Sequence, residues 1–137
     1  MKFSIISEKN QLEQNAACVW VSIKGEKQTA AVAANLLTAL QNGLDAEADV
    51  DSACGLDVNA GQLNAVAVLQ VAAGASRAKL EKHALKIAQY VVEQKASSVA
   101  IDVRAADAAT QAVLVDVLVL AFSQAVYRFD EHKRDAK

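Results

Sequence analysis

The side chains best suited to hold a metal ion are few and far apart in this sequence. Its two histidines are His83 and His132, and neither has a cysteine or glutamate partner at the spacing of zinc ligands. Lys79, Lys82 and Lys86 surround His83, which indicates the solvated side of a helix. His132 lies near the end of a helical run, where a positive charge interacts favourably with the helix dipole. We therefore predict no metal site in this chain.

The two cysteines, Cys18 and Cys54, are predicted to be structural thiols. A nucleophilic cysteine needs a neighbouring base that lowers its pKa, and the nearby sequence supplies none. Cys18 adjoins an alternating apolar run and is expected to be packed, whereas Cys54 could be exposed beside Gly55. The segment Met1–Glu8 returns to charge too soon for a secretory signal. Reduced thiols and a cytoplasmic location follow as expectations.

Asp102 is the residue most suited to act as a general base, because it interrupts an apolar strand pattern. Arg104, Asp107 and Asp116 follow it closely in the sequence. A partly buried aspartate beside an arginine is more often part of a structural ion pair than a base, and we favour that interpretation. Asp116 stands inside an apolar helix, so it either faces solvent along a narrow strip or pairs with a buried cation or backbone amide.

The glycines do not form a phosphate-binding loop. Gly55–Gly61 has neither the spacing nor the Lys-Ser/Thr of a P-loop, and no G-x-G-x-x-G follows a predicted strand. Gly74, Ala75 and Ser76 precede a helix whose first amides could bind an anion, although such a stretch is usually a turn. We therefore assign no catalytic, cofactor-binding or metal-binding residue, and we expect no cofactor in this chain.

Alternating and helical periodicities predict the elements that would position these residues. Period-two runs of Val and Ile predict strands, and stripes at helical spacing predict helices, with Thr29, Ser76 and Asp107 as N-caps. The predicted strands are Lys2–Ser7, Ala17–Lys24, Val50–Val58, Asn64–Val71 and Ser98–Arg104, and the predicted helices are Thr29–Asn42, Ser76–Lys95 and Asp107–His132. Strands separated by helices predict one α/β domain with a mixed, mostly parallel sheet flanked by helices.

Composition and charge restrict the possible partners. The chain has 137 residues, of which 53% are hydrophobic, so one domain with a sizeable core is expected. A formal charge of −2 argues against a dominant attraction to nucleic acid or to an anionic membrane. The apolar stretch Ala112–Phe122 is too short to span a bilayer and contains Asp116. We expect it to be a buried helix of a soluble protein, covered on more than one side.

The end of the last predicted helix carries a specific resemblance. Tyr127–Asp130 reads Tyr-Arg-Phe-Asp and is followed by Lys133, and Gly61–Leu63 leads into the strand Val66–Val71. These strings and the order of elements resemble the amino-terminal domain of the leucyl aminopeptidases, the M17 peptidases. The resemblance extends over nearly the whole chain but is weak in Gly55–Ala60, which indicates a divergent member.

The resemblance implies a macro-like fold for residues 1–137 and a supporting role. The family's metal-binding strings, Asn-Thr-Asp-Ala-Glu-Gly-Arg among them, are absent from this sequence, so it implies that the chain alone is not an enzyme. In a full-length parent, two divalent metals would bind in the catalytic domain. The implied partners are that catalytic domain or copies of this chain, as a homo-oligomer. The alternatives are a macro-like module for ADP-ribose-type ligands or a DNA-binding module, the latter disfavoured by the acidic charge.

Overall fold

The computed structural model describes residues 2–6, 16–24, 35–45, 47–59, 62–72 and 74–135. Its strands are β1 (Lys2–Ile6), β2 (Ala16–Ile23), β3 (Val50–Asn59), β4 (Gln62–Val71) and β5 (Ser98–Asp102), and its helices are α1 (Asn35–Asn42), α2 (Arg77–Glu93) and α3 (Ala108–Asp135). The sheet order is β1-β5-β2-β4-β3. Only β3 runs antiparallel to its neighbour among these strands. The predicted class, α/β with a mixed and mostly parallel sheet flanked by helices, is confirmed.

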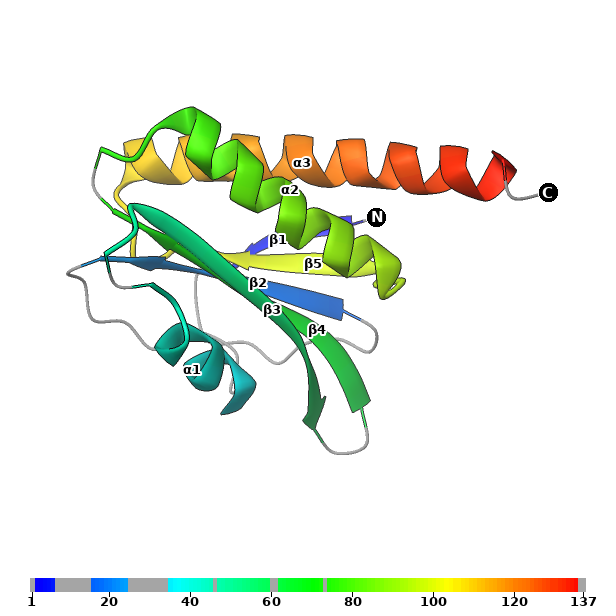
Figure 1. The fold of residues 1–137 in the computed structure, drawn as a ribbon, viewed down its shortest axis with the longest axis horizontal. Coiled ribbons are helices and arrows are strands. Elements are labelled where there is room, and N and C mark those ends of the chain that lie inside the picture. The colour runs from blue at the N-terminus through cyan, green and yellow to red at the C-terminus, as the bar shows by residue number, and fades with distance from the viewer. Residues whose placement is uncertain are drawn as a thin grey trace.

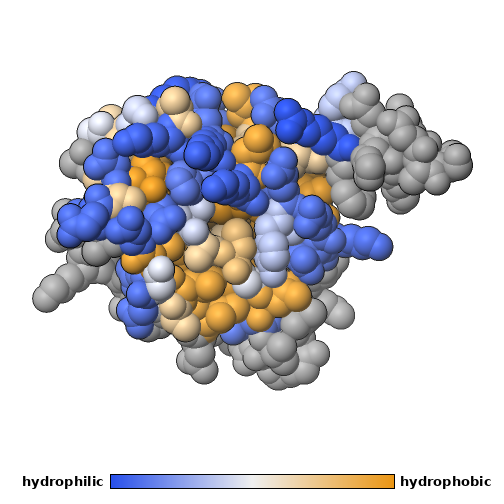
Figure 2. Space-filling view, in the orientation of Figure 1, coloured by the Kyte–Doolittle hydropathy of each residue, from blue (hydrophilic) through white to orange (hydrophobic). Residues whose placement is uncertain are grey.

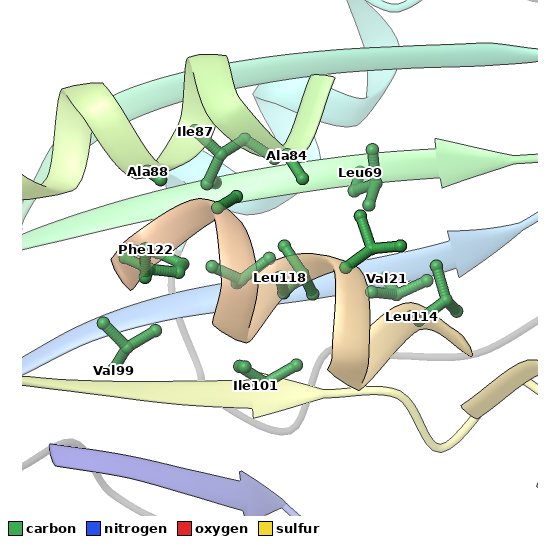
Figure 3. Packing of buried hydrophobic residues seen from close by; sticks show 14 of the residues in the cluster. Val21, Leu69, Ala84, Ile87, Ala88, Val99, Ile101, Leu114, Leu118 and Phe122 are labelled. Carbon is green, nitrogen blue, oxygen red and sulfur yellow. The ribbon is translucent and has the colours of Figure 1, made fainter. Parts of the chain in front are cut away.

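The larger core lies between the sheet and two helices, α2 and α3, which cover the same face (Figure 1). Alternate strand residues such as Val21, Leu69 and Ile101 point toward side chains of both helices, including Ile87 and Leu118 (Figure 3). Figure 3 shows these aliphatic side chains interdigitating between the ribbons. Burial of this face explains why one side of each helix is apolar.

A smaller core lies on the opposite face, beneath α1. It comprises Cys18, Trp20, Leu37, Val66 and Val68, all at most 4% exposed. Because β2 and β4 are buried on both faces, they read as near-continuous apolar runs rather than clean alternations. The intermediate position of these strands in the sheet order accounts for that pattern.

Two of the predicted helix starts are confirmed by their caps. The Ser76 hydroxyl accepts a hydrogen bond from the Lys79 amide at 3.3 Å, and Asp107 Oδ1 accepts one from the Thr110 amide at 2.7 Å. The predicted cap Thr29 lies outside the described residues, in which the first helix begins at Asn35. The predicted strand ending at Arg104 ends instead at Asp102, because the following residues turn toward α3.

Helix α3 is buried on one face only, so the expectation that it is covered on more than one side is wrong for the described residues. Leu114, Leu118 and Phe122 are fully buried against the sheet, whereas Val113 and Leu120 are 40% and 47% exposed. The segment Ala108–Arg128 is long and apolar enough to cross a membrane by length and composition alone. Its packed inner face explains part of that apolar character, since core helices meet the same test.

The free edge of β3 limits pairing with another strand. Figure 2 shows mostly polar residues over α2 and a group of apolar residues below it, in the region of β3, where Leu56 is 38% exposed. Asp51 and Asp57 interrupt this strand with negative charges. Charged residues on an edge strand disfavour the addition of a further strand from another molecule.

Candidate functional site

A crevice of about 680 Å³ opens at the carboxyl ends of the parallel strands. The helix after β4 and the helix after β5 lie on one face of the sheet, whereas α1, which follows β2, lies on the other (Figure 1). Open α/β sheets bind ligands where the connections diverge in this way. The crevice is lined by the ends of two strands, the loops after β4 and β5, the first turn of α2 and the first turns of α3: Ile23, Val71, Ala72, Gly74, Ala75, Leu80, Ala105, Ala106, Asp107, Ala109, Thr110 and Val113.

The chemistry of this crevice suits an apolar group better than a phosphate. Both helix starts that border it are already capped, one by Ser76 and the other by Asp107. The hydrogen bond from the Thr110 amide lowers the pKa of the Asp107 carboxyl, so a negative charge stays at the rim near neutral pH. Gly74 has φ of 77° and open space around it, which identifies the predicted Gly74–Ser76 stretch as a turn.

Among the described residues that line the crevice, no buried side-chain nitrogen or oxygen lacks a hydrogen bond. Within the part of the chain that the structure describes, the buried side-chain nitrogen or oxygen without a hydrogen bond is Trp20 Nε1. Trp20 belongs to the smaller core beneath α1, on the other face of the sheet. A polar ligand in the crevice would therefore meet backbone groups, the hydroxyl of Thr110 and the carboxylate of Asp107.

Asp102 forms the structural ion pair that its sequence context favours. The side chain is fully buried, and Arg104 Nε and Nη2 donate to Oδ1 and Oδ2 at 2.9 and 3.0 Å. The Arg104 backbone amide adds a bond to Oδ1 at 3.3 Å. This bidentate ion pair stabilises the turn after β5, and both carboxylate oxygens accept hydrogen bonds from the guanidinium. The arrangement argues against a general base.

His83 is half-buried, in contact with the sheet rather than fully solvated. Its Nδ1 lies 2.8 Å from the Ser52 hydroxyl of β3. Burial and the nearby charge of Lys86 lower the pKa of His83, while the Asp51 carboxylate opposes them. The side chain of His132 lies outside the described residues. Among described residues, no group of three or more His, Cys, Asp or Glu side chains is placed to hold a metal ion.

Both cysteines have the properties of unreactive thiols. Cys18 is buried in β2, as expected, and burial together with the Asp102 charge raises the pKa of its thiol to about 12. Cys54 is half-buried in β3, and burial raises the pKa of its thiol to about 11. A thiolate is the reactive form, so neither residue is activated for catalysis.

The outer face of α3 is a second candidate site, and it is one that sequence reasoning missed. Val113, Leu120 and Tyr127 are 40%, 47% and 69% exposed and follow one another at intervals of seven residues. Beside Leu120, a groove of about 290 Å³ runs between this helix and α2. At its end Arg77 bridges Asp116 and Glu81, at 2.7 and 2.9 Å. In the sequence, the feature that could have indicated this surface is the interval of seven residues between these apolar side chains.

The chain is similar in sequence to part of a known protein. No protein-family model matches the sequence. The chain is 31% identical over 138 residues to the probable cytosol aminopeptidase of Neisseria meningitidis serogroup A. The match covers all of this chain and the amino-terminal 27% of the relative, so the chain spans about a quarter of that protein's length. The resemblance to the amino-terminal domain of leucyl aminopeptidases is thereby confirmed.

Proposed function

We propose that this chain, which is related over its whole length to the amino-terminal region of a cytosol aminopeptidase, is a non-catalytic domain that binds and supports a separate metallopeptidase domain. The observation that carries the proposal is the outer face of α3. Val113, Leu120 and Tyr127 present apolar side chains to solvent on the last helix of the described chain. Covering such side chains is a common source of affinity between domains.

The chemistry of the polar side chains supports the same proposal. Asp102, Asp107 and His83 are each held by a structural partner, namely Arg104, the Thr110 amide and Ser52. In the proposed arrangement the reacting groups and two divalent metals belong to the partner domain, where the metals would activate water. A macro-like fold, a cytoplasmic location and an oligomeric assembly are parts of this proposal.

The test uses the catalytic part of the Neisseria relative, prepared without its own amino-terminal region. We expect the purified chain to bind it in size-exclusion chromatography and to raise its thermal stability and its hydrolysis of leucine p-nitroanilide. Leu120→Glu should weaken the complex, whereas Gln89→Glu, which adds the same charge at an exposed position of α2, should not. Turnover by the chain alone that a chelator abolishes, or no complex at high micromolar concentration, would refute the proposal.

The crevice favours a second candidate function, a small-ligand module. Its position at the carboxyl ends of the strands is that of ligand sites in open α/β sheets. For ADP-ribose, however, the Asp107 charge at the rim opposes a phosphate. We expect a flat calorimetric titration with millimolar ADP-ribose for the chain, because of this charge, and for Asp107→Asn, because most of the side chains that line the crevice are apolar. Saturable binding by either protein would favour the ligand-binding function.

A further inference from the structure

The floor and the rim of the crevice at the carboxyl ends of the strands differ in their chemistry. The floor includes Val71, Leu80 and Ala106, which are at most 8% exposed. The rim includes exposed Asp107, and Thr110 is the other residue of the lining with a polar side chain. At about 680 Å³, the crevice has the size of small-molecule sites, which are roughly 300–1,000 Å³. A ligand would therefore meet an apolar surface with one negative charge at its edge.

The Asp107 carboxylate can accept a further hydrogen bond. Those it accepts within the described chain come from Thr110, whose backbone amide lies 2.7 Å from Oδ1 and whose hydroxyl also donates. A carboxylate has about four acceptor positions, so about two remain. The amino-terminal end of α3 carries roughly half a positive charge, which is less than the full negative charge of the carboxylate. The rim is therefore net negative beside the apolar floor.

The basic side chains that lie nearest to the crevice in the sequence are paired with other groups. Their nitrogen–oxygen distances are 2.7–3.0 Å, and the pairs are Arg77–Glu81, Arg77–Asp116, Arg104–Asp102 and Lys24 with the carbonyl of Ala48. Asp107 has no ion pair among the described residues. Its charge is therefore available to a cation that enters the crevice.

We infer that the crevice binds a protonated primary amine on an apolar body, with the ammonium against Asp107 and the hydrocarbon on the buried floor. The inference rests on the second candidate function, ligand binding in the crevice, and names the class of that ligand. A free arylalkylamine and the amino terminus of an apolar peptide both have this chemistry. Leu120 and Tyr127 do not line the crevice, so the ligand and the catalytic domain occupy different surfaces that meet at Val113.

The two parts of such a ligand have different roles. An exposed ion pair contributes little to affinity, so most of the affinity comes from covering the apolar floor. The carboxylate selects for the charge of the ligand, because electrostatic complementarity acts mainly on specificity. Among molecules with the same hydrocarbon, an ammonium should therefore bind better than a hydroxyl, and a hydroxyl better than a carboxylate.

An NMR titration of the isotope-labelled chain tests this order with 2-phenylethylamine, 2-phenylethanol and phenylacetate. We expect the amine to shift the amide signals of Gly74, Asp107 and Thr110 and to saturate in the millimolar range, with the alcohol about threefold weaker. Equal affinity for the amine and the alcohol overturns the inference. The absence of shifts at about 10 mM amine, or shifts confined to other parts of the chain, also overturns it.

Three variants test the assigned contacts. Asp107→Asn keeps a good helix cap and should weaken amine binding about threefold, without affecting the alcohol. Asp57→Asn removes the same charge near the end of β3 that pairs with Asn64, away from the crevice, and should leave both ligands unaffected. Ala109→Trp, at an exposed position of the lining, should fill the crevice and weaken both. Circular dichroism checks that each variant folds. Unchanged amine binding by Asp107→Asn overturns the inference.

Peptides distinguish the two sources of the amine. Tighter binding of the dipeptide Phe-Val amide than of 2-phenylethylamine would identify a peptide amino terminus, and weaker binding would identify a free amine. Either result supports the inference, provided that N-acetylation of the dipeptide weakens its binding. Equal binding of the acetylated and free dipeptides overturns the inference, because acetylation removes the positive charge.

The proposals fail separately in these experiments. Leu120→Glu should weaken the complex with the catalytic part of the relative and leave amine binding unchanged. A chain that binds no amine but still stabilises the catalytic part overturns the inference and leaves the proposed supporting function in place. Saturable binding of ADP-ribose without binding of the amine overturns this ligand class and leaves ligand binding in the crevice in place.

Discussion

Replacement of Phe122 by alanine is the strongest test of how α3 is packed. The Phe122 side chain is fully buried, and its ring lies 5.7 Å from that of Phe3 in an edge-to-face contact at 67°. Buried Phe→Ala changes cost about 3–5 kcal/mol, and the aromatic pair accounts for about 0.5–1.5 kcal/mol beyond burial. For a domain of this size, about 3 °C per kcal/mol gives a fall in Tm of roughly 10–15 °C.

The assay is urea unfolding followed by circular dichroism, with Leu120→Ala as the matched control on the same helix. Because Leu120 is 47% exposed, its replacement should change the free energy of unfolding by about 0.5 kcal/mol or less. Equal effects of the two substitutions, or a loss below about 1 kcal/mol for Phe122→Ala, would refute the assignment of an inner and an outer face to α3.

Three further predictions concern other parts of the molecule. Burial lowers the pKa of His83 in the folded chain, so His83 binds a proton more weakly there than in the unfolded chain. The free energy of unfolding should therefore fall as the pH drops below about 6.5. In urea titrations at pH 7.5 and 5.5, His83→Gln should reduce this dependence on pH. Because its thiol pKa is about 11, Cys54 should react with iodoacetamide at pH 8 about 100-fold more slowly than a free cysteine. Cys18, which is buried, should react only after unfolding. Rapid labelling of the folded chain, detected by mass spectrometry, would contradict this prediction. Gly55→Val should destabilise the folded chain by about 1–3 kcal/mol, since a Cβ at this position would lie 2.7 Å from Leu36 Cδ2. In a double-mutant cycle measured by thermal unfolding, Leu36→Ala should reduce this cost.

Helix caps and ion pairs could be predicted from the sequence where the two partners are only a few residues apart. Ser76 and Asp107 were recognisable as caps because each precedes an apolar helical stripe, and both accept the expected amide. The ion pair of Asp102 with Arg104 was likewise predictable, since the two residues are separated by one position. Such contacts depend little on the rest of the fold.

Arrangements between distant segments could not be read in the same way. The strand order brings the loops after β4 and β5 together, so that Gly74 and Asp107 line one crevice. Apolar composition also does not say which face of a helix is covered. Residues Ala112–Phe122 are apolar almost all round, yet Val113 and Leu120 remain exposed because the described elements pack against one side of α3.

The pairing of β1 has a consequence for the order in which the molecule can fold. β1 contacts the sheet through β5, and the register joins Lys2 to Ser98, 96 residues later in the chain. At about 5–20 residues per second, roughly 5–20 s of synthesis separate these two positions. Closing so long a loop also makes the contact entropically costly until the rest of the sheet has formed. Of the described strands, β1 is therefore synthesised first but pairs with β5, which has not yet been synthesised when β1 leaves the ribosome.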